Sequence, residues 1–441
     1  MKKQSIASFE EAERYLNETP RFTTKNTMED TRAFLHRLGD PDRRLRIIHV
    51  AGTNGKGSVC AYLRSVLEAA GYRVSVFTSP HLVDIRERFV TDGKMVSRED
   101  FLRAFLHIYH MLDWEALDRG TGAYHPTFFE YLFFMAMVLF PEQSPDYCIL
   151  ETGLGGRLDA TNAVWGKELA VITHISLDHV EYLGDTVEKI AGEKAGILCA
   201  GAPLLYWDTC PETDRVLEQR AAELGIPAWS VSKSDYRFLS FTNKSIDFSV
   251  RTRYYNNISL TLHTIAAYQM ENAALAVRAA ELLDGGQAVT PEQIRRGIRD
   301  AFWAGRMEEV LPEVYVDGAH NEDGIRAFLE TVEADQVRGN RTLLFGVVQD
   351  KDYVRMTEEL AGSGLFHRIA VAQMQTGRAA APEKLGELLA GYPGCEYCVY
   401  ENVSKAFREL LGSRGPGERL YIAGSLYLAG EIKEMLENDK F

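Results

Sequence analysis

The chain has 441 residues, of which 46% are hydrophobic and 25% charged, and its formal net charge at pH 7 is −14. This composition is typical of a globular enzyme with two or three domains, and the acidity argues against a general nucleic-acid-binding protein, which needs a basic surface. The first residues lack the apolar segment of a secretory signal, and the apolar run at 128–140 is too short to cross a bilayer.

Six cysteines are scattered along the chain, and one pair has the spacing Cys395-x-x-Cys398. Without a second such pair, we interpret this spacing as incidental rather than as a zinc or redox site. We therefore expect a reducing, cytoplasmic environment without disulfides. We also expect a monomer with no membrane or nucleic-acid partner.

The first 45 residues are polar and helical in pattern. Ser8 begins a capping-box pattern with the glutamates that follow it, and residues 31–38 form a second helical run. A β–α series comes next, with strand-like runs at 46–50, 73–78, 147–150 and 169–175. This alternation predicts an α/β fold in which helices cover both faces of a parallel sheet.

The pattern changes at residues 236–263, where apolar residues alternate with Thr, Ser, Asn and Lys. We expect a small antiparallel sheet there, followed by a helix at 264–283. Near residues 299–308 a boundary is expected, because the β–α pattern then restarts. This divides the chain into domains 1–299 and 300–441, the second with strands at 314–316, 342–348, 368–372, 396–400 and 419–423.

A glycine-rich segment, Gly52-x-x-Gly55-Lys56-Gly57-Ser58, follows the first strand and precedes a helix. Strand, loop and helix in this order indicate a phosphate-binding loop, in which backbone N–H groups and the helix N-terminus attract the anion. Lys56 would add a charge, and Ser58 could ligate Mg²⁺. The loop is shorter than the common form and has an extra glycine between Lys and Ser, so an ordinary glycine-rich turn is the structural alternative.

Glu151 ends an apolar strand and precedes the turn Thr-Gly-Leu-Gly-Gly. At the carboxyl end of a parallel strand, an acidic side chain can hold the magnesium of a bound nucleotide. A dinucleotide-binding fingerprint is disfavoured because Leu158 stands where its third glycine or alanine is needed. A structural turn with a surface glutamate is the remaining alternative.

Four further residues lie near predicted element ends. His179 follows another strand and is either a hydrogen-bonded residue or a metal ligand. Lys194 lies in what looks like the last turn of a helix, where a lysine is usually a solvated charge. Asp317 follows the strand at 314–316 and is either a turn residue or a ligand contact. Arg306, just upstream, is either a linker charge or a phosphate-binding residue.

Together these segments resemble the folylpolyglutamate synthase and dihydrofolate synthase family within the Mur ligase superfamily. The motifs, which extend through nearly the whole chain, are HVAGTNGKGS (49–58), TSPHL (78–82), ETGLGGRLDATN (151–162), ITHISLDH (172–179), GEKAGI (192–197), DGAHN (317–321) and AGSLYLAGE (423–431). The resemblance implies a central phosphate-loop ATPase domain with a parallel sheet and a small antiparallel sheet. It also implies a smaller Rossmann-like C-terminal glutamate ligase domain.

The resemblance also implies roles for individual residues. Those implied for ATP binding are Asn54, Gly55, Lys56, Gly57, Ser58, Asn272, Arg306 and Asp317. The implied magnesium ligands are Ser79, Glu151, His179 and Lys194, of which Lys194 would carry a CO₂-derived carbamate that helps place a second Mg²⁺. The residues implied for the pteridine and substrate side are Thr127, Phe128, Phe129, Glu130, Leu158, Asp159, Ala160 and His320. Lys56, His179 and Lys194 would be catalytic.

The chain departs from the family pattern at two positions. Tyr268 stands where the family often has histidine, which puts the role of that histidine in doubt, and Glu322 replaces the proline that usually follows DGAHN. Neither change affects an implied phosphate or metal ligand. We therefore expect an ATP-dependent ligase that adds L-glutamate to tetrahydrofolate through an acyl phosphate, with the two domains meeting over the nucleotide.

Three alternatives are open at this point. The enzyme could also add the first glutamate to dihydropteroate, since the chemistry is the same. A peptidoglycan Mur ligase would need a nucleotide-sugar domain before the phosphate loop, and the segment there is short. A non-catalytic ATP-binding regulator would have no need for the complete set of implied metal ligands.

Overall fold

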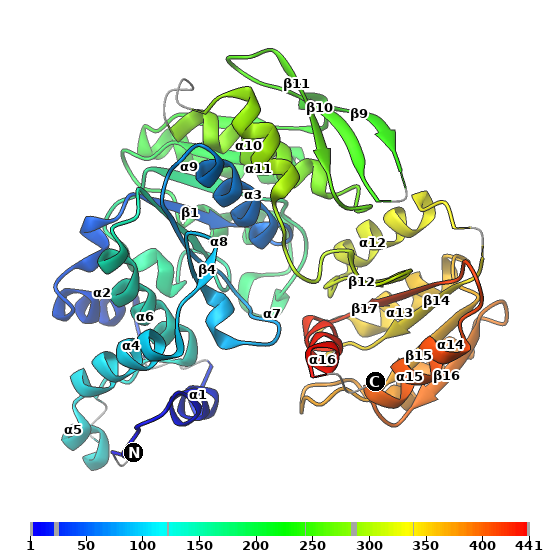
Figure 1. The fold of residues 1–441 in the computed structure, drawn as a ribbon. Helices are drawn as coiled ribbons and strands as arrows, with labels where there is room; N and C mark the ends of the chain where they lie inside the picture. The colour runs from blue at the N-terminus through cyan, green and yellow to red at the C-terminus, as the bar shows by residue number, and fades with distance from the viewer. Residues whose placement is uncertain are drawn as a thin grey trace.

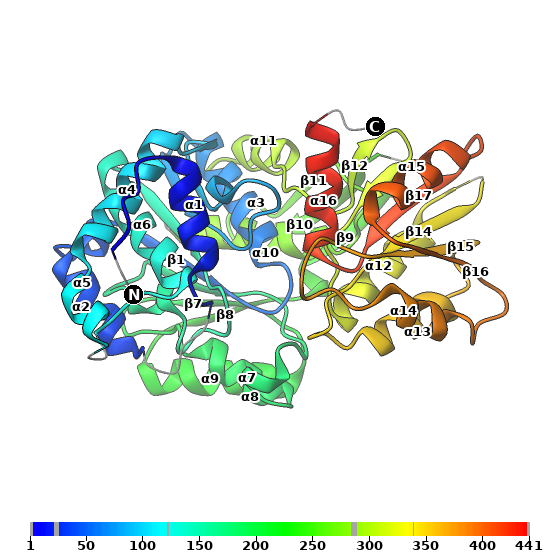
Figure 2. The ribbon, with the colours of Figure 1, turned by 90° about the horizontal axis from the view of Figure 1, so that it is seen from below.

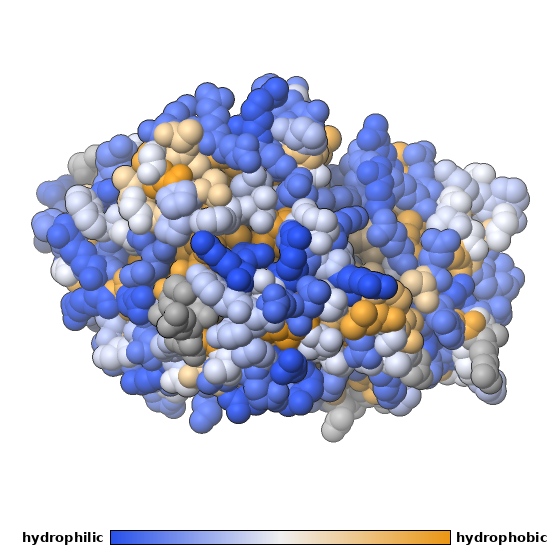
Figure 3. Space-filling model, turned by 90° about the horizontal axis from the view of Figure 1, so that it is seen from above, coloured by the Kyte–Doolittle hydropathy of each residue, from blue (hydrophilic) through white to orange (hydrophobic). Residues whose placement is uncertain are grey.

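The computed structural model describes residues 3–21, 26–120, 123–242, 244–283, 289–337 and 339–438. Within these residues the chain forms three β-sheets with helices packed against them (Figure 1). No helix in the described part of the chain is both long enough and apolar enough to span a membrane. The surface seen from above is mainly hydrophilic, with hydrophobic residues in small patches, as the composition predicts (Figure 3).

The largest sheet has the strand order β4-β3-β2-β5-β1-β6-β7-β8. Its six strands from β2 to β8 in this order are parallel, and β3 and β4 continue the sheet as an antiparallel edge. The bounds are β1 (Ile47–Ala51), β2 (Val74–Phe77), β3 (Phe89–Thr91), β4 (Lys94–Met95), β5 (Tyr147–Glu151), β6 (Leu169–Ile172), β7 (Leu204–Trp207) and β8 (Ala228–Val231).

Helices cover both faces of this sheet because alternate strand residues point to opposite sides. Ile48 and Val50 of β1 join one core cluster with α3 (Lys56–Ala69), α10 (Gln269–Leu283) and α11 (Pro291–Asp300). Ile47 belongs to the cluster on the other face. The helices there are α1 (Phe9–Glu18), α2 (Met28–Arg37), α4 (Arg98–Met111) and α6 (Phe128–Gln143), with α8 (Val187–Ala195) and α9 (Pro211–Leu224) beside them. The short helix α5 (Trp114–Arg119) lies at the periphery, and α7 (Val180–Leu183) lies on the side that faces the C-terminal part.

The second sheet is antiparallel, in the order β11-β10-β9, as the sequence predicted. Its strands are β9 (Tyr236–Phe241), β10 (Ile246–Arg251) and β11 (Asn257–Leu262). The inner residues of β10 and β11 join the α3–α10 core cluster, so this sheet is an extension of the first part of the molecule. Helix α10 begins at Gln269 rather than at 264, because Ile265 and Ala266 are instead buried in a core cluster of the C-terminal sheet.

The third sheet has the order β12-β13-β17-β14-β15-β16 and is parallel except for the β12–β13 pair. Its strands are β12 (Glu308–Leu311), β13 (Val314–Val316), β14 (Arg341–Phe345), β15 (Arg368–Ala372), β16 (Glu396–Tyr400) and β17 (Arg419–Ala423). Helices α12 (Glu322–Ala334), α13 (Tyr353–Gly362) and α14 (Pro382–Leu389) cover one face, and α15 (Val403–Ser413) and α16 (Leu426–Glu437) the other. The predicted second β–α series is confirmed.

Helix α16 lies along the border between the two parts of the molecule (Figures 1 and 2). Leu82, from the loop after β2, packs against the core cluster beneath this helix. Gly430 makes that approach possible, because a Cβ atom there would lie only 2.4 Å from the Leu82 carbonyl oxygen. The two parts therefore meet at a packed contact beside the loops that follow the strands.

Candidate active site

A cleft of about 1640 Å³ lies between the two parts of the molecule, and every residue that the sequence predicted as catalytic or ligand-binding lines it. These residues come from segments that are far apart in the chain, and many of them directly follow parallel strands. Loops at the carboxyl ends of parallel strands meet at one edge of a sheet. The fold therefore explains why the predicted residues converge.

The phosphate loop has the predicted strand–loop–helix form. Gly55 has φ of 88° and precedes Lys56, the first residue of α3. Gly52 also has to be glycine, because a Cβ atom there would lie 1.8 Å from Thr173 Oγ1. The Lys56 ammonium donates to the carbonyl oxygens of Gly52 and Thr53, each at 3.1 Å. The lysine is thus held against its own loop, and the start of α3 faces the cleft.

The extra glycine of this loop has a structural explanation. A Cβ atom on Gly57 would lie 2.7 Å from a ring carbon of Trp303, so the indole packs directly on the loop. Trp303 belongs to the segment that connects α11 to β12. The connection between the two parts of the molecule therefore touches the phosphate loop, a contact that no sequence pattern predicted.

Glu151 ends β5 and is only 2% exposed. Its Oε2 accepts a hydrogen bond of 3.0 Å from the backbone N–H of Ser79, so these two predicted metal ligands are adjacent. Burial raises the pKa of Glu151, while Lys56 opposes the rise. Among the described residues no Lys, Arg or His nitrogen lies within 4.0 Å of this carboxylate. A buried carboxylate without an ion-pair partner, next to a serine residue, suits a hard divalent cation.

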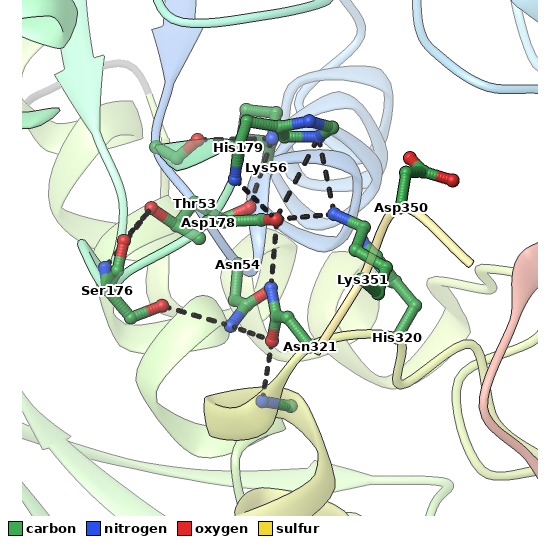
Figure 4. A network of polar contacts seen from close by, with 12 residues as sticks. Thr53, Asn54, Lys56, Ser176, Asp178, His179, His320, Asn321, Asp350 and Lys351 are labelled. Carbon is green, nitrogen blue, oxygen red and sulfur yellow. Dashed lines mark hydrogen bonds and ion pairs between the residues drawn. The ribbon is translucent and has the colours of Figure 1, made fainter. Parts of the chain in front are cut away.

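His179 lies in a polar network that joins the two parts of the molecule (Figure 4). Its Nε2 is 3.3 Å from the ammonium of Lys351, which also forms an ion pair with Asp178. Burial lowers the pKa of His179 to about 4, so the ring is neutral and can offer a lone pair to a metal. Burial alone would raise the pKa of Asp178, but Lys351 and the nearby histidines lower it below its usual range. A metal could bind His179 Nε2 only if the Lys351 ammonium left this position.

The same network holds the phosphate loop. Asn321 donates to Asp178 Oδ2 at 3.0 Å and to Asn54 Oδ1 at 3.1 Å, and Asn54 donates to Asp323 at 2.7 Å. Asn54 belongs to the phosphate loop, whereas Asn321 and Asp323 begin α12 of the C-terminal part. The position of the loop is therefore coupled to the docking of the two parts. In the described residues, no group of three or more His, Cys, Asp and Glu side chains is arranged to hold a metal without further ligands.

Lys194 is buried, which contradicts the interpretation of a solvated charge. Its side chain is in the last turn of α8, the residue is 2% exposed, and Nζ donates to the Gly52 carbonyl at 2.7 Å. Burial, and then the charge of Lys56, lower the pKa of Lys194 well below its usual value. The side chain is therefore favoured as a neutral amine.

Asp317 is a turn residue, although not an N-cap. It accepts hydrogen bonds from Ala319 N at 2.8 Å, Met307 N at 2.9 Å and the Tyr268 hydroxyl at 2.6 Å, while Asn321 caps α12. Tyr268 thus ties the start of α10 to the C-terminal part. Arg306 donates to the neighbouring carbonyl of Gly305, and no carboxylate in the described residues lies within ion-pair distance of it. Its guanidinium is available to a ligand in the cleft.

Several polar residues predicted to bind substrate form hydrogen bonds that stabilise the surrounding helix and turn. Thr127 and Glu130 form the capping box of α6, and Glu130 also accepts from Asn26 at 2.7 Å and Thr31 at 3.0 Å. Asp159 accepts four hydrogen bonds, from the backbone N–H groups of residues 153, 154 and 161 and from the Thr161 hydroxyl. All of its lone-pair positions are therefore used in shaping the turn.

The apolar residues predicted to bind substrate line the cleft. Phe129 packs on Gly153, and Leu158 is 67% exposed on the wall of the cleft. Phe128 and Ala160 line the cleft as well. His320 lies deeper, with Nδ1 2.7 Å from the Gly318 carbonyl, and burial lowers its pKa to about 4. An exposed leucine and aromatic rings next to a phosphate loop suit a ligand with a flat apolar part.

Sequence reasoning missed several cleft residues. Lys351 follows β14, so the rule that located Glu151 and His179 could have found it. Arg88, which also lines the cleft, and Trp303, which packs on the phosphate loop, carried no such signal, since neither directly follows a parallel strand.

Comparison with known proteins gives consistent results. The family model described as "Mur ligase middle domain" matches residues 50–280, and "Mur ligase, glutamate ligase domain" matches residues 305–426. The chain is 34% identical to the Bacillus subtilis dihydrofolate synthase/folylpolyglutamate synthase, over 98% of this chain and the whole of that protein. It is 30% identical to the Escherichia coli dihydrofolate synthase/folylpolyglutamate synthase, over 89% of this chain and 86% of that protein.

Solved structures agree with the sequence comparison. The Mycobacterium tuberculosis folylpolyglutamate synthase complexed with ADP has a TM-score of 0.87 and 27% identity, covering 97% of this chain and 98% of that one. The Escherichia coli FolC in complex with DHPP and ADP has a TM-score of 0.85 and 29% identity, and covers all of both chains.

Proposed function

We propose that this chain, which belongs to the folylpolyglutamate synthase and dihydrofolate synthase family of Mur ligases, is an ATP-dependent ligase that joins L-glutamate to a folate. One observation carries the proposal: a phosphate loop, a buried unpaired carboxylate and a buried lysine converge in one cleft with an apolar wall. The ADP complexes of similar proteins support ATP as the nucleotide.

The chemistry follows from the acceptor's carboxylate, which is a poor electrophile because its charge repels a nucleophile. Transfer of the ATP γ-phosphoryl group to this carboxylate gives an acyl phosphate and ADP. The amine of glutamate then attacks the acyl carbon, and inorganic phosphate leaves. Lys56 and the N–H groups at the start of α3 would hold the transferring group and neutralise its charge, which is most of what this step requires.

Magnesium, when bound, supplies a fixed positive charge on the phosphate oxygens. Ser79, Glu151 and His179 would hold one ion, and we propose that Lys194, as a carbamate, helps to hold a second. The neutral amine that burial favours at Lys194 is the form that reacts with CO₂. Carbamylation would turn a cation-forming side chain into an anion beside Gly52.

We propose that residues 1–299 bind ATP and the acceptor, and that residues 300–441 form the glutamate ligase domain. Asn272, Arg306 and Asp317 would then contact the nucleotide from both sides of the border. The Asn54–Asn321 contact supports this arrangement, because it ties the phosphate loop to the C-terminal part. Closing the cleft would exclude water and protect the acyl phosphate from hydrolysis. The cytoplasmic location and the monomeric state stay predictions.

A bifunctional enzyme that also acts on dihydropteroate is the second candidate, because relatives with both activities in their names cover nearly the whole chain. ADP release with dihydropteroate and with tetrahydrofolate, each with and without L-glutamate, tests both proposals. Glutamate-dependent release with tetrahydrofolate alone indicates a monofunctional enzyme, and release with both indicates a bifunctional one. Release with neither acceptor would refute the ligase proposal.

Glu151→Gln and His179→Ala should each raise the Mg²⁺ concentration needed for half-maximal ADP release by about tenfold to a hundredfold. Glu151→Gln removes a charged ligand and keeps the shape of the side chain, and His179→Ala removes the imidazole ring of a partly exposed residue. Glu212→Gln, an exposed change in the first turn of α9, is the control and should leave the magnesium titration unchanged. If both variants follow the wild-type titration, the metal is bound elsewhere.

A further inference from the structure

Arg88 is a buried cation on the wall of the cleft. It ends the short 3-10 helix Ile85–Arg88 and is 5% exposed. Its Nε donates to His81 Nδ1 at 2.8 Å, and its guanidinium carbon lies 5.4 Å from the centre of the Phe128 ring. Burial lowers the pKa of Arg88 to about 10, so it is still charged at neutral pH.

No group in the described part of the chain neutralises this charge. No carboxylate oxygen there lies within 4.0 Å of its nitrogens. His81 does not do so either, because an imidazole ring carries no negative charge and its Nδ1 only accepts the hydrogen bond from Arg88 Nε. Glu151 is the acidic residue that most favours the charged form of Arg88, although it forms no ion pair with it. The comparably buried Arg419, by contrast, forms ion pairs with Glu313 and Asp335.

A second arginine shares the same ring. The Arg21 guanidinium carbon lies 5.8 Å from the centre of Phe128, and its Nη1 donates to the hydroxyl of Tyr427 in α16. Two cations therefore flank one aromatic ring, and the charge of Arg21 further disfavours a charged Arg88. A buried charge without a partner is costly, and like charges side by side add to that cost. An anionic ligand bound between the two guanidinium groups would offset this free-energy cost.

The identity of this anion follows from its place. The phosphates of ATP have their own cations and N–H donors at Lys56 and the start of α3. Arg88 lies 5.4 Å from the centre of the Phe128 ring, on the proposed acceptor side, and its charge also interacts with the buried carboxylate of Glu151. Within the proposed ligase reaction, the anion that has to lie between an apolar acceptor and the metal site is the carboxylate of the acceptor. Guanidinium groups suit carboxylates because two N–H donors match two oxygens.

We propose that Arg88, assisted by Arg21, binds the carboxylate end of the acceptor substrate and holds it for phosphoryl transfer. This inference rests on the proposed function. Neutralising the carboxylate would lower its repulsion of the incoming phosphoryl group, so Arg88 would serve both binding and reaction.

The test compares Arg88→Met with Arg86→Met in equilibrium binding. Arg86 is a matched control two residues away, because it is already paired with Asp84. The ligands are dihydropteroate and its carboxamide, which lacks the negative charge, each titrated by calorimetry with ADP present. Arg88→Met should weaken dihydropteroate binding by about tenfold to a hundredfold, leave carboxamide and ADP binding unchanged, and remove the preference for the acid. Arg88→Lys should restore part of that preference.

Thermal unfolding of the ligand-free variants gives an independent readout. Removing an unpaired buried charge should leave the melting temperature of Arg88→Met at or above that of the wild type. A lower melting temperature, together with equal losses for acid and carboxamide, would mean that Arg88 is structural and would overturn the inference. Wild-type dihydropteroate affinity in Arg88→Met would overturn it too. If the unmodified protein binds neither dihydropteroate nor tetrahydrofolate, the proposed function itself fails.

Discussion

Lys56→Ala should abolish ADP release and leave the fold intact. Among the described residues, the Lys56 ammonium bonds only to the carbonyl oxygens of Gly52 and Thr53 in its own loop, so its loss removes no contact there between distant parts of the chain. In the reaction, the same ammonium would leave these carbonyls for the transferring phosphoryl group. Removing a charge-assisted contact of this kind typically costs about 3–4 kcal/mol at the transition state, a hundredfold to a thousandfold in rate.

The measurement is glutamate-dependent ADP release, together with far-ultraviolet circular dichroism to show that the variant is folded. Lys405→Ala is the control, since Lys405 is an exposed residue of α15 paired only with Glu401. Near wild-type turnover in Lys56→Ala would show that the loop does not bind the phosphates of ATP. A loss of folded structure in Lys56→Ala would show that the loop depends on this lysine.

Much of the site could be predicted because a simple rule links sequence to position. Glu151 and His179 each follow a strand of a parallel sheet, and such residues gather at one edge. The strand pattern was clear enough to locate them, and the antiparallel strands at 236–263 were recognised by their alternation. Strands β7 and β8 were not predicted individually, although they are as long as β2 and β6, which were. In β8 three of the four residues are exposed, so it lacks the apolar run that marks a buried strand.

The rest depends on contacts between residues far apart in the chain. Arg86 and Arg88 are indistinguishable in sequence, yet Arg86 is paired with Asp84 and Arg88 is buried without a carboxylate. Gly57 looked like a departure from the common loop, and its reason is the ring of Trp303, almost 250 positions away. Local sequence patterns do not predict contacts of this kind, because secondary-structure propensity and hydrophobic periodicity depend only on residues that are close in sequence.

Asp159 and Asp317 show a second limit of sequence reasoning. The family resemblance implied that both contact a ligand, whereas the residues alone left Asp317 as either a turn residue or a ligand contact. In the structure their oxygens already accept hydrogen bonds from nearby donors, which fold the turns around the cleft. If these residues take part in ligand binding, they therefore also do so by fixing the conformation of the turns. An acidic residue in a glycine-rich turn can either accept hydrogen bonds that stabilise the turn or bind a ligand, and the sequence alone does not distinguish these two roles.

Lys194→Ala should be nearly inactive, with at least about a hundredfold loss of ADP release, because it removes a proposed anion beside the phosphates. The proposed modification is the addition of CO₂ to the neutral amine, which forms an N–C bond and releases one proton. Burial and the charge of Lys56 favour this neutral form by lowering the pKa of Lys194. The folded-state pKa is depressed, so the neutral form dominates once the pH exceeds that depressed value, and acidification below it would reverse the modification.

Lys167→Ala is the matched control for this prediction. Burial also lowers the pKa of Lys167, to about 8, and its ammonium likewise donates to a backbone carbonyl, that of Ile197, but it does not line the cleft. Acetate or formate should partly restore the activity of Lys194→Ala, because a small carboxylate can occupy the space of the missing carbamate, and should not affect Lys167→Ala. With ¹³CO₂, the wild type should show a carbamate carbon resonance that Lys194→Ala lacks. Because the signal reports the modification without turnover, its absence from the wild type, or full activity of Lys194→Ala, would remove the carbamate from the mechanism while leaving the ligase proposal in place.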